Sequence, residues 1–330
     1  MTASVGSLAA PLLALISARI FRRRGVAVAT GLLAAVHPAF LLTSSDIQSE
    51  PLFLALLLGA GYLFLAAVDR PSTSLALVAG GTTALAALTR ASALALAPFL
   101  LAPILDRRYP FRARAHLAGS ALVGFLFVLA PWTLRNAIVF GEFLPVNDAA
   151  GNAFYQGNSD WTIRFYEVRT RAGYDAWMRA FDADMRRRTE EIDRSGRGSP
   201  AARSHAFAAQ ALAERRRDLA GWARLLLRKA WDWLRPYPDP MFWPRAIVFG
   251  AGTYYLFLSS LGAVGLVKAP RTGVRAFVLA FLAVTLIAHV VIIVVWRYRV
   301  PYWDPVAILY GVFGAGTLLL RWKPSTSPTR

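Results

Sequence analysis

The sequence has 330 residues, 56% of them hydrophobic, and a mean hydropathy of +0.43. This composition is too apolar for an ordinary soluble domain, and the apolar residues form long blocks, as is typical of a membrane protein. Because the chain contains no cysteine, it can form neither a disulfide framework nor a thiolate metal site. No P-loop, no GxGxxG motif after a strand and no GxSxG motif occurs, which excludes the soluble enzyme classes that these motifs define.

The net charge of +18 does not indicate a nucleic-acid partner, because the basic residues cluster in short connectors between apolar runs. That placement is typical of membrane topology. At the N-terminus, the arginines at 22–24 follow the first apolar run and do not precede it. We therefore expect a membrane span there and not a cleaved signal peptide.

A span needs about 20 apolar residues to cross roughly 30 Å of hydrocarbon. The candidate spans, in chain order, are residues 4–20, 25–43, 51–68, 74–88, 91–105, 116–134, 246–267, 274–296 and 305–320. The fourth and fifth are short, and we expect a tight hairpin there, since one continuous helix would bury Arg90 in the middle of the bilayer at a high cost. His37 and Pro38 predict a kink inside the second span.

The distribution of basic residues orients the chain. With the N-terminus outside, the cytoplasmic connectors hold 15 Lys and Arg, whereas the short outer connectors hold three. Cytoplasmic loops carry this excess in membrane proteins. The predicted fold is an all-α membrane protein with about nine transmembrane helices and one large extracytoplasmic loop subdomain. Its expected parts are N-terminal spans at 1–134, the outer loop with amphipathic helices at 135–245 and C-terminal spans at 246–330.

Two amphipathic helices are predicted in the outer loop. Trp177, Phe181 and Met185 stand at helical spacing among charged residues, and the run "RSGRGSP" at 194–200 predicts the end of that helix. The second run, "LAGWARLLLRKAWDWLRPYP" at 219–238, places Trp222, Leu225, Leu226 and Trp233 among basic residues. This composition fits a helix in the lipid headgroup layer and equally fits a helix of a small soluble subdomain.

Residues 131–160, "PWTLRNAIVFGEFLPVNDAAGNAFYQGNSD", are predicted to lie on the outer face. Arg135 and Asn136 should end an outgoing helix, and an irregular loop rich in Gly and Asn should follow, including Gly157 and Asn158. Glycine permits close backbone approach, and Asn and Arg present several polar atoms at once. Such groups suit a hydroxyl-rich or phosphate-bearing ligand, although any loop that leaves a membrane helix also needs turn residues.

Four short motifs resemble a known family. They are the Trp-x-x-Arg-Asn run from Trp132 with the glycines that follow it, "SEPLF" at 49–53, "LTRASALALAP" at 88–98 and "RYRVPYWDP" at 297–305. In this order and on this face they resemble the polytopic GT-C glycosyltransferases, among them the protein-mannosyltransferase and lipid-A aminoarabinose transferase types. The resemblance extends from about residue 19 to residue 322.

The resemblance implies an enzyme of the bacterial cytoplasmic membrane with its active face outside. It implies transfer of a sugar from a polyprenyl-phosphate donor to a lipid, glycan or protein acceptor. Cations that hold the leaving phosphate lower the barrier of such a reaction, and the candidate residues are Arg90, Arg135, Arg297, Arg299 and Lys229. The alternative for each arginine is a side chain that reaches out to lipid headgroups. Asn136, Gly157 and Asn158 are further candidates for substrate binding.

Glu50 is the candidate catalytic residue, because a carboxylate at the outer mouth of a helix can orient an acceptor or serve as a base. The alternative is a residue that only favours the start of the following helix through the helix dipole. Asp46 is expected to be a solvated or capping residue. A divalent ion between the two carboxylates has no support from a further acidic ligand nearby, so no metal or cofactor is expected.

One departure from the family concerns its main catalytic carboxylate, which lies in the first outer loop, after an initial span. This chain begins with the equivalent of the second span, so we expect either a truncated reading frame or a non-catalytic relative. Two other functions stay open, namely a transporter or flippase of lipid-linked saccharides and a non-enzymatic protein that binds a carrier lipid.

Overall fold

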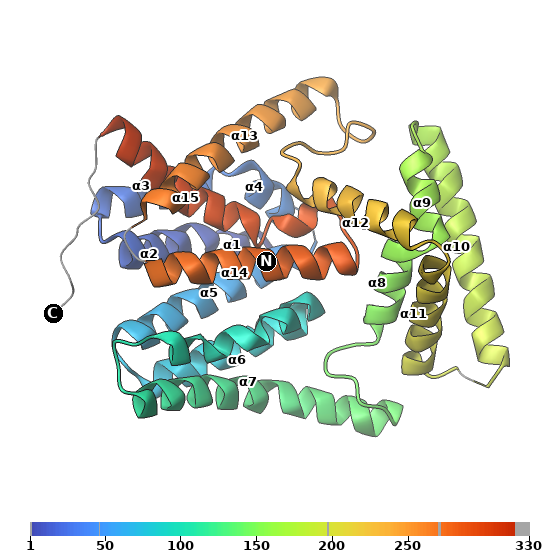
Figure 1. Ribbon diagram of the computed structural model, residues 1–330, viewed down its shortest axis with the longest axis horizontal. Coiled ribbons are helices and arrows are strands. Elements are labelled where there is room, and N and C mark those ends of the chain that lie inside the picture. Colours follow the sequence, from blue (N-terminus) through green and yellow to red (C-terminus); the bar gives the residue numbers. More distant parts are fainter. Residues whose placement is uncertain (1, 46, 197, 270–271, 321–330) are drawn as a thin grey trace. The chain divides into compact units, whose positions relative to one another are not determined.

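The structure is a computed structural model that describes residues 2–45, 47–196, 198–269 and 272–320. Throughout these residues the chain forms helices and no strand, which confirms the all-α prediction. The chain folds as two compact units. The first unit comprises Met1–Pro131, Tyr254–Thr285 and Arg299–Arg330, and the second comprises Trp132–Thr253 and Leu286–Tyr298. Figure 1 gives the order of the helices along the chain.

The apolar segments of the sequence coincide with helices. In chain order these are α1 (Thr2–Gly6), α2 (Ala9–Phe21), α3 (Arg24–Ala35), α4 (Pro38–Ser44), α5 (Glu50–Asp69), α6 (Thr73–Thr89), η1 (Ala91–Leu105), α7 (Phe111–Phe140), α13 (Arg245–Lys268), α14 (Thr272–Val291), η2 (Trp296–Arg299) and α15 (Trp303–Leu319). Each of the nine predicted spans falls on one or two of these elements.

Among the described residues, five stretches are helical, long and apolar enough to cross a membrane, and α3 with α4 makes a sixth if this bent pair is one span. The five are Thr2–Phe21, Glu50–Asp69, Phe111–Phe140, Arg245–Lys268 and Gly273–Val291. The elements α6, η1 and α15 are apolar but shorter. The chain is therefore an integral membrane protein with five or six spans by length, and the number nine stays a prediction.

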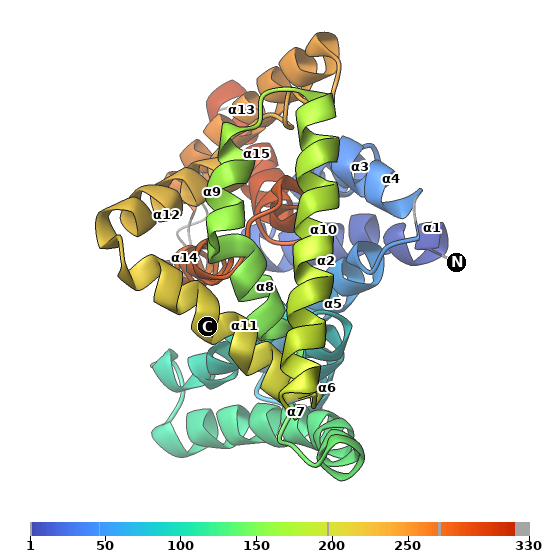
Figure 2. The ribbon, with the colours of Figure 1, turned by 90° about the vertical axis from the view of Figure 1, so that its right-hand side faces the viewer.

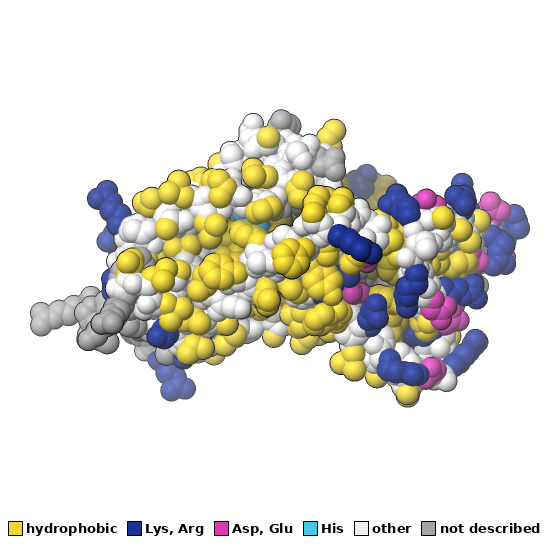
Figure 3. Space-filling model, turned by 90° about the horizontal axis from the view of Figure 1, so that it is seen from above, with side chains coloured by type: hydrophobic (Ala, Val, Ile, Leu, Met, Phe, Trp, Pro, Cys, Tyr) yellow, Lys and Arg dark blue, Asp and Glu magenta, His cyan; other side chains and the backbone are white. Residues whose placement is uncertain are grey.

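The surface agrees with this assignment. Figure 3 shows broad areas of hydrophobic side chains on the face that it presents. Large apolar side chains are exposed on several of the apolar helices, among them Leu32 of α3, Phe127 of α7 and Phe249 of α13. Exposed apolar area of this extent is unfavourable in water, whereas the hydrocarbon of a bilayer accommodates it.

Two predicted breaks are confirmed. The helices α3 and α4 meet at an angle of 49° where His37 is extended (φ −67°, ψ 121°) before Pro38, because a proline disfavours helical backbone at the residue before it. Arg90 is also extended (φ −145°, ψ 114°) and separates α6 from η1, which contact one another. The segment at 91–105 differs from a plain α-helical span, since it is a 3₁₀ helix that contains Pro98 and Pro103.

The helices α13 and α15 of the first unit pack closely through glycines. A Cβ atom on Gly265 would collide with the carbonyl oxygen of Tyr310, and one on Gly314 would collide with that of Leu261. In lipid, where apolar burial provides little driving force between helices, small residues let backbones approach and gain van der Waals contact. These glycines therefore set the distance between the two helices.

The second unit contains five helices between residues 149 and 234, namely α8 (Ala149–Asn158), α9 (Asp160–Glu167), α10 (Arg171–Arg194), α11 (Pro200–Arg216) and α12 (Leu219–Leu234). Figure 2 shows α8 and α9 in succession beside the long helix α10. Tyr155, Phe181 and Phe207 form the centre of an apolar cluster, and Trp177 and Met185 pack against it. The predicted stripe on α10 is thus confirmed, as is the break after Arg194.

The apolar residues of α12 lie on two sides of the helix. Leu225 and Trp233, two of the residues for which the sequence left a headgroup-layer and a subdomain interpretation open, are buried inside the protein. The large apolar side chains that α12 exposes are Leu219, Leu227, Trp231 and Leu234. Aromatic and leucine spacing alone could not distinguish the two sides, because α12 carries apolar residues on both.

Candidate functional site

Glu50 and Arg90 form an ion pair in the first unit. Glu50 is the first residue of α5 and only 4% exposed, and its Oε1 lies 2.7 Å from Nη1 of Arg90. The same guanidinium donates to Oγ of Ser49 at 3.4 Å and lies 5.9 Å from the centroid of the Phe53 ring. The start of α5 and the break between α6 and η1 are thus joined by one charge-assisted contact.

The surroundings of the Glu50–Arg90 pair, called the corner below, also include the turn before α15. Tyr302 and Ser92 share a hydrogen bond of 2.9 Å between their hydroxyl groups, and the Tyr302 ring meets that of Phe53 edge to face at 5.6 Å. Ser92 follows Arg90 by two residues, and Phe53 follows Glu50 by three. Three of the four motifs that carry the family resemblance therefore converge in the first unit, although they lie far apart in the sequence.

A second polar group of the first unit is fully buried. Arg299 and Asp304 are 2% and 0% exposed, with 3.8 Å between Nε and Oδ1. Nε2 of His37 lies 3.9 Å from Oδ2 of Asp304, and the hydroxyl of Tyr255 lies 3.5 Å from the same oxygen. The Arg299 guanidinium also lies over the Tyr255 ring at 4.5 Å. Ionised groups inside a membrane protein are costly and are a default indication of function.

Sequence reasoning did not identify Asp304 or Tyr255. A signal for Asp304 was present, since this acidic residue belongs to the motif with Arg297 and Arg299 and stands in the first turn of an apolar helix. Of those two arginines, Arg297 is exposed and lies 5.8 Å from the ring of its neighbour Tyr298. Their predicted role in substrate binding stays a prediction.

In the second unit, α7 continues to Phe140, so the prediction that Arg135 and Asn136 end it is wrong. The helix stops before Gly141, whose φ of +70° is left-handed and is the backbone conformation that ends many helices. Asn136 is buried and donates through Nδ2 to the carbonyls of Leu144 and Val146, at 2.9 and 3.1 Å. Its amide therefore holds the chain that follows the helix.

Arg135 donates to Oδ1 of Asn136 at 3.1 Å. Its guanidinium also lies 5.4 Å from the ring of Trp132 and 5.5 Å from that of Phe140. The guanidinium is thus near two aromatic rings, which orient it without an acidic partner in these contacts. Substrate binding by Arg135 and Asn136 stays a prediction.

Gly157 and Asn158 end a helix, α8, where the sequence predicted irregular loop. A Cβ atom on Gly157 would collide with the carbonyl oxygen of Ile292. Nδ2 of Asn158 donates to the carbonyls of Val291 and Ile292 at 2.9 and 3.0 Å, and Nζ of Lys229 donates to the Ile292 carbonyl at 3.2 Å. These donors satisfy carbonyl groups at the end of α14, which has no further turn to bond them.

Lys229 is 1% exposed, and burial lowers its pKa from 10.5 to about 7. Its Nζ also lies 3.4 Å from Oδ1 of Asn158. The structure thus brings two of the predicted substrate-binding residues together, in contacts that anchor a helix end. Their role towards a substrate stays a prediction.

The described residues contain no group of three or more His, Asp or Glu side chains that could hold a metal ion. Asp46, which was expected to be solvated or to cap a helix, lies outside the described residues.

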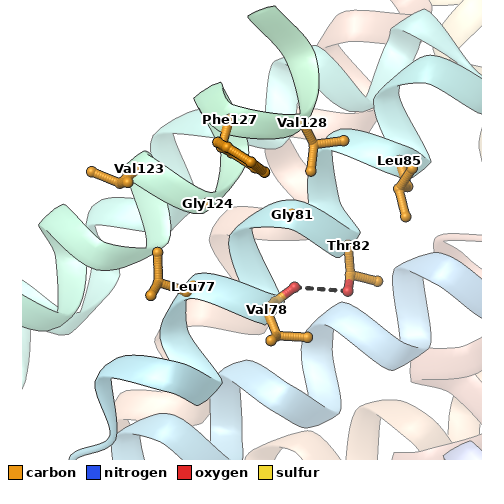
Figure 4. A pocket seen from close by; sticks show the side chains of 9 residues that line it. All are labelled: Leu77, Val78, Gly81, Thr82, Leu85, Val123, Gly124, Phe127 and Val128. Carbon is orange, nitrogen blue, oxygen red and sulfur yellow. Dashed lines mark hydrogen bonds between the residues drawn. The ribbon is translucent and has the colours of Figure 1, made fainter. Parts of the chain in front are cut away.

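An apolar groove of about 420 Å³ lies between α6 and α7 in the first unit. Figure 4 shows its lining side chains, which are Leu77, Val78, Gly81, Thr82, Leu85, Val123, Gly124, Phe127 and Val128. The one hydroxyl among them, that of Thr82, donates to the carbonyl of Val78 at 2.8 Å. The groove therefore presents a hydrocarbon surface that suits a lipid chain.

Together these features define a helical integral membrane protein with an ion-paired corner at the ends of its helices. Residues 2–134 match the family described as dolichyl-phosphate-mannose-protein mannosyltransferase. The match covers "SEPLF" and "LTRASALALAP", so the resemblance to GT-C type glycosyltransferases is confirmed for this part of the chain. No curated protein and no solved structure matches the chain.

Proposed function

We propose that this protein transfers a sugar from a polyprenyl-phosphate carrier to an acceptor on the outer face of the membrane. The observation that carries the proposal is the Glu50–Arg90 pair at 2.7 Å. It lies where three motifs converge, and two of them fall within the residues that match the mannosyltransferase family. The proposal includes the predicted topology of nine spans with an outer N-terminus, which puts this corner on the outer face.

Arg90 suits the leaving phosphate of this reaction, and Glu50 suits the acceptor hydroxyl. When the acceptor oxygen attacks the anomeric carbon, the bond from that carbon to the phosphate oxygen breaks, and the carrier phosphate leaves with the bonding electrons. Arg90 would bind this phosphate and stabilise its charge. Glu50 would hold the acceptor hydroxyl or take its proton as the new bond forms. A donor phosphate that engages Arg90 would also loosen the ion pair and release the carboxylate for the acceptor.

Arg90 is the leading phosphate ligand among the predicted cations. Arg299 and Lys229 are both buried against protein partners, whereas 17% of the Arg90 side chain is exposed at the end of α6. Arg135 and Arg297 remain candidates of second rank. The groove between α6 and α7 offers an apolar surface for the carrier chain.

The test separates binding from turnover. Wild type, Arg90→Gln and Glu50→Gln are purified in detergent and titrated with a short-chain polyprenyl-phosphate sugar, and sugar transfer is measured in membranes that contain each variant. We expect Arg90→Gln to weaken donor binding about tenfold or more, as for a lost charge-assisted contact. We expect Glu50→Gln to bind the donor within about threefold of wild type but to lose most of its transfer activity.

Arg112→Gln is the matched control, since Arg112 is exposed at the start of α7 and is predicted to face the cytoplasm. If Arg90→Gln binds the donor as well as Arg112→Gln does, the phosphate role is wrong. If Glu50→Gln retains full transfer activity, the catalytic role is wrong.

A further inference from the structure

A polar pocket in the second unit has no role in the function proposed above. It has a volume of about 240 Å³ and lies among the α8–α9 junction, α10 and α11. Its lining residues are Tyr155, Asp160, Trp161, Arg164, Asp184, Arg188 and Glu214. Five of the seven are charged, and the other two are aromatic residues that carry hydrogen-bond donors.

Asp184 is fully engaged within the protein. Its Oδ2 accepts hydrogen bonds from Nε1 of Trp161 at 2.8 Å and from Nε of Arg188 at 2.6 Å, and Oδ1 accepts from Arg187 at 2.5 Å. Burial raises the pKa of Asp184, but the hydrogen bonds from Arg188, Arg187 and Trp161 outweigh it and lower the pKa to about 2. The carboxylate is therefore ionised, and it fixes the Trp161 ring and the Arg188 guanidinium in place.

The other two acids also have partners. Oε2 of Glu214 accepts from the backbone N–H of Asp160 at 2.8 Å, and Oε1 accepts from Gln210 at 3.0 Å. Oδ1 of Asp160 pairs with Arg215, which is buried. Each of these carboxylates retains lone pairs that can accept from a hydroxyl group, because a carboxylate has about four acceptor positions.

The cations of the pocket, in contrast, retain donors. Arg188 uses Nε on Asp184, and its two terminal amino groups have no hydrogen-bond partner among the described residues. Arg164 lies 5.1 Å from the centroid of the Trp161 ring, and no carboxylate pairs with it in the described part of the chain. Arginine side chains with free donors bind carboxylate and phosphate groups, which accept two parallel hydrogen bonds.

We propose that this pocket binds an acidic saccharide unit, meaning one sugar ring that carries a carboxylate or a phosphate ester. Arg164 and the terminal amino groups of Arg188 take the anionic group. Glu214 and Asp160 accept hydrogen bonds from ring hydroxyls, and Trp161 supplies an aromatic wall. All lining residues belong to the second unit, so the site is independent of the corner at Glu50 and does not rest on the proposed transferase function.

The test uses the full-length chain in detergent and calorimetric titration. Four compounds are compared: a uronic acid, a hexose 6-phosphate, the corresponding neutral hexose and inorganic phosphate. We expect one or both acidic sugars to bind at least about tenfold more tightly than the neutral hexose and inorganic phosphate. The acidic sugar that binds more tightly shows whether the pocket takes a carboxylate or a phosphate ester. Equal binding of inorganic phosphate, or no binding of either acidic sugar, overturns the proposal.

Two variants locate the site. Arg164→Gln removes a cation that pairs with no carboxylate of the described residues, so the fold should be retained, and we expect binding to weaken at least about fivefold. Arg179→Gln makes the same charge change on α10, at an exposed residue outside the pocket, and should leave binding unchanged. If both variants bind like wild type, or both weaken equally, the pocket is not the binding site.

Discussion

Nδ2 of Asn158 donates a hydrogen bond of 3.0 Å to the carbonyl oxygen of Ile292, a residue far away in the sequence. Lys229 donates to the same carbonyl, so an amide from α8 and an amine from α12 together cap the end of α14. A buried amine in such a place makes stability depend on pH.

The first prediction concerns Lys229 and alkaline pH. Its pKa is about 7 in the folded protein because of burial, against 10.5 for the ordinary side chain. Between these two values the unfolded chain binds more protons, so the free energy of unfolding should rise with pH, by up to about 1.4 kcal/mol per pH unit. Below about pH 7 the amine is protonated in both states, and Lys229 contributes no pH dependence.

Lys229→Met should therefore be more stable than wild type at pH 7, with a gap that closes by about pH 10. Thermal unfolding in detergent across this range measures the gap. The carbonyls at the end of α14 keep Asn158 as a donor in the variant. A lower stability of Lys229→Met at pH 7 would mean that the amine is a net stabilising cap.

The second prediction concerns the contact between α13 and α15. Gly265→Val should destabilise the protein by at least about 3 kcal/mol, because its side chain would meet the Tyr310 backbone. Gly61→Ala in α5, where a Cβ atom meets nothing within 4 Å, should be neutral or stabilising by up to about 1 kcal/mol. Unfolding temperatures of the two variants in one detergent test both statements, and equal losses would contradict the close packing.

The third prediction concerns α12 and the two open interpretations of its apolar residues. If the helix lies in the headgroup layer, Trp231, which is 53% exposed, should be quenched by lipid-borne quenchers in vesicles. Trp231→Phe should then lower the fraction of fluorescence that these quenchers reach, whereas Trp233→Phe should not, since Trp233 is buried. An unchanged fraction in Trp231→Phe would favour a helix exposed to water.

The fourth prediction concerns the topology. The chain has no cysteine of its own, so single cysteines can be placed without background. Arg22→Cys should be shielded from an impermeant thiol reagent in sealed cells, whereas Gly198→Cys should be labelled. Labelling of both positions from outside would contradict an outer N-terminus and, with it, the outer position of Glu50.

The sequence was sufficient for features that depend on local composition. The positions of the apolar helices followed from the length of apolar runs, and the bend at Pro38 followed from the chemistry of proline. The inward stripe of Trp177, Phe181 and Met185 followed from helical spacing alone. Each of these signals comes from neighbouring residues, which the sequence displays directly.

Features that depend on distant partners could not be predicted. Gly157 and Asn158 have the composition of a turn, yet they end a helix because carbonyl groups near residue 292 use the asparagine amide. Asp304 has the appearance of a helix-start residue, and only the fold reveals that Arg299, Tyr255 and His37 surround it. The polar pocket is assembled from four helices, so no single stretch of sequence indicates it.

The 3₁₀ conformation of η1 changes what its length means. Each residue of a 3₁₀ helix advances the chain by about 2.0 Å, against about 1.5 Å in an α-helix. The 15 residues of η1 therefore extend over about 30 Å. An α-helix of the same number of residues would be shorter by roughly 8 Å. A segment with too few residues to cross a bilayer as an α-helix thus has a length that matches the hydrocarbon thickness, about 30 Å, because each of its residues advances the chain further.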